Sequence, residues 1–285
     1  MSHHCYADDT HAYLVVKPLD SWNNISQRLE SCLSDISTWM CGNMLKLNED
    51  KTELIIFAPK HWVKDLSNWR KIVSSAECVK NLGVYFDETL SMTKQVSAIS
   101  KSCFHQIRNI GRIRQYITED ACRMLVCSLV TSRLDYGNTL LYGLPTSVIQ
   151  RLQQVQNTAV RMITRQKKSD HITPVLHSLH WLPVSYRCQC RLLLCVFKSL
   201  IQKAPIYLQE LIQVHKSSRS LRSGTRSLLT APSVRTKTYE ERRFDRAAAF
   251  IWNALPNEMR DTTQSGDVFQ KKLKTHLFRQ AFSIT

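Results

Sequence analysis

The spacing of apolar residues predicts a chain that starts with mixed strands and helix and continues with helices alone. In residues 20–41 the apolar side chains recur at helical spacing, and Gly42 is a natural end for that helix. Two short apolar runs, 54–57 and 82–86, predict strands, the first of them ended by Pro59. The helical positions are Ile25, Leu29, Cys32, Ile36 and Met40.

After residue 91 the pattern predicts helices. The helix expected over 94–113 has one apolar stripe formed by Val96, Ile99, Cys103, Ile107 and Ile110. Its opposite face, at ~100° per residue, carries Lys94, Lys101, Arg108 and Arg112. This basic face is expected either to contact phosphates or to be a plain solvated surface. Further helices are expected over 118–133 with Thr118 as N-cap, 146–166, 184–202, 239–255 and 267–281, and a linker over 217–227.

Charge divides the 285 residues into parts of different sign. Residues 1–90 carry 9 basic and 12 acidic side chains, residues 91–205 carry 16 and 4, and residues 206–285 carry 14 and 7. An acidic head followed by a basic body indicates a metal-site module joined to a polyanion-binding module. We therefore expect three parts, 1–90, 91–205 and 206–285.

The composition excludes several classes of protein. No apolar run approaches the ~18 residues that span a bilayer, and the N-terminus lacks the features of a signal peptide. Ten cysteines without a secretory context predict reduced thiols. We therefore expect a protein of the nucleus and cytoplasm that does not contact membranes.

Tyr6-Ala7-Asp8-Asp9-Thr10 is the motif with the clearest chemistry. Apolar residues on both sides predict a strand, an Asp-Asp turn and a second strand. Carboxylates of this kind, with substrate phosphates, hold Mg²⁺ for phosphoryl transfer. The alternative is a solvated hairpin, because Asp-Asp pairs also favour turns.

A second constellation contains His171, His177, His180, Cys188 and Cys190. Its spacing does not match the usual paired ligands of zinc, so these residues are expected to serve packing and surface roles. The sequence shows no Gly-rich phosphate loop, Ser-His-Asp signature or redox Cys-x-x-Cys pair.

In their order along the chain, these motifs resemble the C-terminal part of the reverse transcriptase of LINE-type, jockey-like (non-LTR) retrotransposons. The Tyr6–Thr10 box is followed by Trp39-Met40, Asn43, Leu45–Asn48 and Lys51–Glu53, and then by Lys80–Val84. Later landmarks are Ser132–Tyr136, Leu152–Asn157, His171–Leu176, Leu179–Val184 and Trp252–Pro256. The resemblance covers essentially the whole chain.

The resemblance implies an α+β fold. It would consist of a truncated reverse-transcriptase palm, with a β-hairpin, short strands and one or two helices, and a mostly α-helical thumb and C-terminal region. Asp8 and Asp9 would be the Mg²⁺ ligands and catalytic residues, and Lys51 would protonate the leaving pyrophosphate. Tyr6 would lie near the primer terminus, and Asn81, Leu82 and Gly83 would hold the primer strand. The partners would be an RNA template and a DNA primer.

In this family a further aspartate, the nucleotide-binding residues and the fingers precede the Tyr-x-Asp-Asp box, whereas five residues precede Tyr6 here. The sequence therefore leads us to expect a fragment without polymerase activity of its own. Two alternatives stay open: a non-enzymatic nucleic-acid-binding protein derived from a mobile element, and a decaying product without a function.

Overall fold

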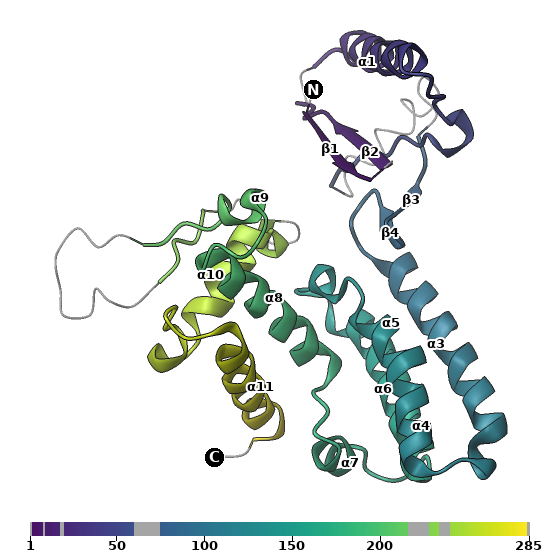
Figure 1. Ribbon diagram of the computed structural model, residues 1–285, viewed down its shortest axis with the longest axis vertical. Helices are drawn as coiled ribbons and strands as arrows, with labels where there is room; N and C mark the ends of the chain where they lie inside the picture. The colour runs from purple at the N-terminus through teal and green to yellow at the C-terminus, as the bar shows by residue number, and fades with distance from the viewer. Residues whose placement is uncertain are drawn as a thin grey trace. The chain divides into compact units, whose positions relative to one another are not determined.

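The computed structural model describes residues 2–7, 9–17, 20–59, 75–215, 228–233 and 240–283. The fold is α+β, as expected, with many helices and two small two-stranded sheets (Figure 1). It divides into two compact units, Met1–Val79 and Lys80–Thr285, which are described separately below. The expected division at residues 90 and 205 stays a prediction, and the expected linker 217–227 lies outside the described residues. No helix in the described ranges combines the length and hydropathy needed to cross a membrane.

The first unit contains a β-hairpin and one long helix. Strands β1 (Ser2–Tyr6) and β2 (Asp9–Tyr13) pair antiparallel, with Tyr6 opposite Asp9. Helix α1 (Trp22–Gly42) ends where the sequence predicts, and the 3-10 turn η1 (Glu49–Lys51) follows it. Among the described residues of this unit, the buried apolar side chains are Ile25 and Ala58, so its core is small.

The strand predicted over 54–57 is wrong. The described residues 52–59 are assigned to no helix or strand, and one backbone bond, from Ala76 N–H to Leu54 O (2.8 Å), joins this run to a later segment. Phe57 is 53% exposed. A strand needs a ladder of bonds with a neighbour as well as apolar residues, and a single bond does not make a ladder.

The second unit begins with a hairpin formed by β3 (Cys78–Asn81) and β4 (Val84–Asp87). The strand expected over 82–86 is partly wrong, because Leu82 and Gly83 form the two-residue turn between these strands. Both have positive φ, 45° and 81°, as a tight hairpin turn of matching twist requires. The apolar run Leu82–Phe86 conceals this turn, since leucine is not a typical turn residue.

Four helices pack around the first core of this unit. All five apolar residues predicted for the stripe of 94–113 are at most 8% exposed. The predicted cap is also present, because Thr118 Oγ1 accepts the Ala121 N–H (3.2 Å). The helix expected over 118–133 is interrupted by a π-helical segment, Cys127–Thr131. The four helices are α3 (Thr93–Ile113), α4 (Glu119–Val126), α5 (Ser132–Asp135) and α6 (Thr146–Thr164).

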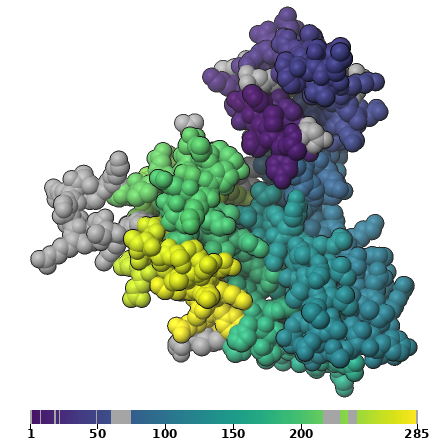
Figure 2. All heavy atoms as spheres, viewed as in Figure 1, coloured from purple at the N-terminus to yellow at the C-terminus, as the bar shows by residue number. Residues whose placement is uncertain are grey.

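A second core lies farther along the chain, where α8 (Val184–Leu200) packs against α10 (Phe244–Asn253) and α11 (Gly266–Phe282). The rings of Phe197 and Phe269 stack with centroids 4.1 Å apart, and Trp252 is fully buried beside them. In Figure 2 the yellow C-terminal segment lies directly on the green segment that contains α8. The smaller helices α7 (Thr173–Ser178) and α9 (Ile206–Gln209) complete this part (Figure 1).

A bidentate ion pair joins α5 to α8. The Arg187 guanidinium donates from Nε to Asp135 Oδ1 (2.8 Å) and from a terminal nitrogen to Asp135 Oδ2 (2.5 Å). Both side chains are less than a quarter exposed. Replacing one member of such a pair leaves the other as an unpaired charge in a partly desolvated position.

We expect Asp135→Asn to lower the free energy of unfolding by about 2 kcal/mol. This loss is smaller than the loss on breaking a fully buried ion pair, because both side chains are partly exposed. Urea denaturation followed by circular dichroism measures this change. Arg123→Gln is the control, because Arg123 pairs with Glu119 at 3.6 Å on the open surface of α4 and should cost less than about 0.5 kcal/mol. Equal losses in the two variants would contradict the structural role of the Asp135–Arg187 pair.

Candidate nucleic-acid interface

The basic face predicted for α3 is exposed in the structure. Lys94, Lys101, Arg108 and Arg112 are all exposed, while the opposite face of the helix is buried. Within the described part of the chain, none of these four cations has an ion pair. The helix contains no acidic residue, so four unpaired positive charges lie along one side of it. Such a row is suited to a polyanion with regularly spaced charges.

Arginines from two neighbouring helices flank this face. Arg151 of α6 donates to Ser97 Oγ (3.1 Å), and Arg133 of α5 donates to Ser102 Oγ. Ser97 and Ser102 lie on either side of the Lys94–Arg112 row when the helix is turned at ~100° per residue. The flanking guanidiniums are exposed, so the positive surface is wider than one helix.

The turn between β3 and β4 is held by a tyrosine that follows α5. Tyr136 Oη donates to Leu82 O (2.6 Å), and a Cβ placed on Gly83 would lie 3.6 Å from the Tyr136 ring. Lys80 Nζ lies 5.6 Å from the centroid of the Tyr85 ring. Among the described residues, none donates a hydrogen bond to the buried Asn81 Oδ1 atom. The Leu82 carbonyl of the turn is therefore held by Tyr136, whose ring lies near Gly83.

Asp87 connects this hairpin to the start of α3. Its carboxylate accepts the backbone N–H groups of Ser91 (2.9 Å) and Met92 (2.8 Å) and the Thr89 hydroxyl (2.8 Å). Burial alone would raise the pKa of Asp87, but these donors outweigh it and hold the pKa below its ordinary value. The same contacts occupy both carboxylate oxygens, so Asp87 is part of the helix start.

The Tyr6–Thr10 box forms a hairpin as predicted, but Asp9 belongs to β2 and pairs with Tyr6, so the expected Asp-Asp turn is partly wrong. Tyr6 ends β1 and is 60% exposed, Ala7 has a positive φ of 53°, and Asp9 is the exposed first residue of β2. Asp8 lies outside the described residues. Among the described residues no group of three or more His, Cys, Asp and Glu side chains is placed to hold a metal. The fit of Mg²⁺ to both aspartates therefore stays a prediction.

Lys51 lies at the end of η1, and its side chain is exposed. Its backbone N–H donates to the Asn48 carbonyl (3.2 Å) and to Asn48 Oδ1 (3.3 Å). In the part of the chain that the structure describes, no hydrogen bond or ion pair joins Lys51 to Asp9. Its role at a leaving pyrophosphate stays a prediction.

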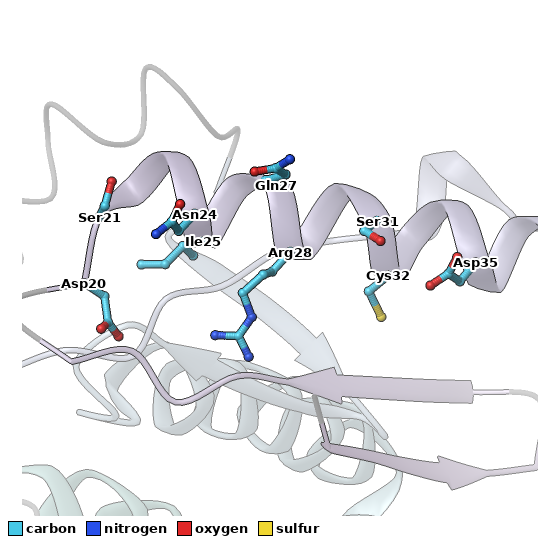
Figure 3. Close-up of a pocket in the computed structure, with 9 residues that line it drawn as sticks. All are labelled: Asp20, Ser21, Asn24, Ile25, Gln27, Arg28, Ser31, Cys32 and Asp35. Carbon is cyan, nitrogen blue, oxygen red and sulfur yellow. The ribbon is translucent and has the colours of Figure 1, made fainter.

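A shallow pocket lies along α1 and is lined by two carboxylates, those of Asp20 and Asp35. Figure 3 shows Asp20, Arg28 and Asp35 among its nine lining residues. The Asp20 carboxylate already accepts the Lys17 N–H (2.7 Å). The lining mixes both signs of charge with neutral polar groups, so it indicates no particular ligand.

Of the His and Cys constellation, two histidines lie near an aromatic ring and Cys188 is buried. His177 and His180 lie 5.1 and 5.4 Å from the Phe278 ring centroid. Burial raises the pKa of Cys188 to about 12 and that of Cys103 to about 11, so both thiols stay protonated at neutral pH.

Several polar side chains of the sequence motifs are engaged in internal contacts. Gln153 Oε1 accepts the Val184 N–H (2.9 Å), and buried Gln156 donates to Leu182 O (2.9 Å). Asn253 accepts the Leu229 N–H (2.9 Å) and donates to its carbonyl (2.8 Å). These residues join segments of the fold, and their amide groups are not available to a ligand.

Comparisons with protein families, with curated proteins and with solved structures find no match for this chain.

Two glycines of the second unit should respond to alanine in opposite directions. Gly83→Ala should lower the free energy of unfolding by about 1 kcal/mol, because alanine is strained at positive φ.

Gly111→Ala should raise the free energy of unfolding by up to about 1 kcal/mol, because Gly111 lies inside α3, where glycine is less favourable than alanine. The nearest atom to an added Cβ at Gly111 is Met162 Sδ, at an ordinary 3.9 Å. Thermal and urea unfolding measure both, and a stabilising Gly83→Ala would contradict the turn.

Asp87 should make stability depend on pH in the acidic range. Its pKa is lower in the folded chain than the ordinary value of 3.8. Its contribution is therefore fully present above about pH 4 and is lost as the pH falls through the folded pKa. Urea unfolding at pH 6 and at pH 3 should show that Asp87→Asn is more destabilising at pH 6. An equal effect at both pH values would contradict the capping role.

Proposed function

We propose that the second unit, Lys80–Thr285, binds the sugar-phosphate backbone of a nucleic-acid duplex through the basic face of α3. The observation that carries this proposal is the row of Lys94, Lys101, Arg108 and Arg112, exposed and without ion pairs in the described structure. A row of charges without base-reading groups is suited to contacts that are independent of sequence.

The natural duplex in this proposal is RNA template paired with DNA primer. The resemblance to LINE-type reverse transcriptases supports it, because the ordered motifs assign Lys80–Val84 to the primer strand and the following helices to the thumb. The Leu82–Gly83 turn and the adjoining start of α3 agree with such an arrangement. Under the same proposal Asp8 and Asp9 are Mg²⁺ ligands, and the ion would supply charge stabilisation for phosphoryl transfer.

A quadruple variant tests the binding proposal directly. Replacing Lys94, Lys101, Arg108 and Arg112 by glutamine should weaken binding to a primed RNA–DNA duplex by about tenfold or more at low salt. The slope of log affinity against log salt should fall in magnitude by about 3, since about one counterion is released per phosphate contact. Fluorescence anisotropy over a salt series measures both quantities.

A charge-matched control separates the α3 face from overall charge. Lys271, Lys272, Lys274 and Arg279 are exposed on α11, and replacing them by glutamine removes the same charge. That variant should keep most of the affinity and of the salt slope. Equal losses in the two variants, or a salt slope unchanged by the α3 variant, would overturn the assignment of the site.

Duplex binding is also what the second candidate function requires, namely a nucleic-acid-binding protein from a mobile element without catalysis. The exposed α3 face supports both candidates equally. Primer extension with Mg²⁺, comparing the unmodified chain with Asp9→Asn, separates them. Extension that depends on Asp9 supports the enzyme, and binding without extension supports the binding protein.

A further inference from the structure

The helices α3 and α6 run parallel and in register. Near their starts, Arg151 donates to Ser97 Oγ (3.1 Å). Near their ends, the Arg114 guanidinium donates to Met162 O (2.8 Å) and Ile163 O (2.7 Å). The two C-terminal ends therefore lie together, at the opposite end of α3 from the β4 strand, whose Tyr85 N–H contacts Gln95 at the helix start (3.0 Å).

Positive charge continues past the end of α3 onto the segment that follows α6. Arg165 donates to Arg114 O (3.4 Å), which places its guanidinium beside the residue that follows α3. Lys167 and Lys168 follow directly and are exposed. Residues 136–169 contain no acidic side chain. A second group of exposed cations thus lies at the end of α3 that carries Arg112.

The acidic residues near this group are held by other partners. The Asp170 carboxylate accepts the backbone N–H of Lys167 (2.9 Å) and the Ser169 hydroxyl (3.4 Å). Glu119 and Asp120, at the start of α4, lie 3.6 and 3.8 Å from the Arg123 guanidinium. In the described structure neither Arg165, Lys167 nor Lys168 has an ion pair, so all three charges are available to a ligand.

The length of α3 sets how far this group lies from the β3–β4 turn. Lys94 and Arg112 are separated by about 27 Å along the axis at 1.5 Å per residue. That distance corresponds to about 8 base pairs of duplex at 3.4 Å per step. A duplex held at the turn and lying along α3 reaches the second group only if it is longer than this.

We infer that Arg165, Lys167 and Lys168 form a distal phosphate-binding site that engages the duplex about one helical turn away from the β3–β4 turn. This inference rests on the proposed function, and it implies that the affinity for a duplex depends on the length of the duplex. Charge complementarity supports a nucleic-acid duplex as the occupant, because these exposed cations lie at the end of α3 that carries Arg112 and residues 136–169 contain no acidic side chain. It predicts that affinity rises as the duplex is extended past the end of α3.

Two duplex lengths test the inference with the full chain. Primed RNA–DNA duplexes of about 6 and about 16 base pairs span about 20 and about 54 Å. The unmodified chain should bind the longer duplex more tightly. The triple variant Arg165→Gln, Lys167→Gln, Lys168→Gln should match it within about twofold on the shorter duplex and lose about tenfold on the longer one. Anisotropy titrations at low salt and low temperature measure all four affinities.

A second triple variant controls for charge. Arg191, Lys198 and Lys203 are exposed on and just after α8, and their replacement by glutamine should reduce both affinities equally and slightly. The inference is overturned if the distal variant loses the same factor on both lengths or behaves as the unmodified chain on both. Failure of the unmodified chain to bind either duplex would instead refute the proposed function. Circular dichroism confirms that each variant is folded.

Discussion

Packing of α3 against α6 determines which side chains of the second unit can meet a partner. Burial of Val96, Cys103 and Ile110 fixes the rotation of α3 about its own axis. The polar face of an amphipathic helix lies opposite its apolar face. Burial of the apolar face therefore leaves the opposite face, with Lys94, Lys101, Arg108 and Arg112, exposed to solvent. The parallel register then brings the C-terminal ends of both helices together, and with them Arg114 and Arg165. The positive surface is therefore a consequence of core packing, not of a separate binding loop.

The polar residues of the sequence motifs act mainly as connections between segments. Tyr136 fixes the Leu82 carbonyl, Asp135 pairs with Arg187, and Gln156 binds the Leu182 carbonyl. Each joins residues at least 26 positions apart, which local propensity cannot do. The contacts of Asp135 and Gln156 also satisfy polar groups that are at least partly buried. These contacts are structural, whereas the cations of α3 that are proposed to bind phosphates, such as Lys94 and Lys101, lie outside the motifs.

The sequence was sufficient where periodicity alone decides the structure. The α3 stripe, the Thr118 cap and the end of α1 at Gly42 follow from spacing and local capping chemistry. The prediction of a strand over 82–86 was partly wrong because Leu82 adopts the positive φ of a turn, which is unusual for leucine. The prediction of a strand over 54–57 was wrong because apolar residues alone do not show whether a neighbouring strand is present to pair with them. The α3–α6 register, and hence the contact of Arg165 with the Arg114 carbonyl, depends on tertiary packing and could not be predicted from spacing.

The two units pose separate physical questions. In the first unit the described hairpin is exposed and the buried apolar residues are few, and a two-stranded sheet gains little stability by itself. The chemistry proposed for Asp8 and Asp9 therefore depends on how firmly that hairpin is held. In the second unit the cations project from helices with two well-packed cores, so their spacing is fixed before any ligand binds. Since the helices that carry these cations are already ordered, binding does not require a segment to fold, and duplex affinity should depend on the second unit and be largely insensitive to changes in the β1–β2 hairpin.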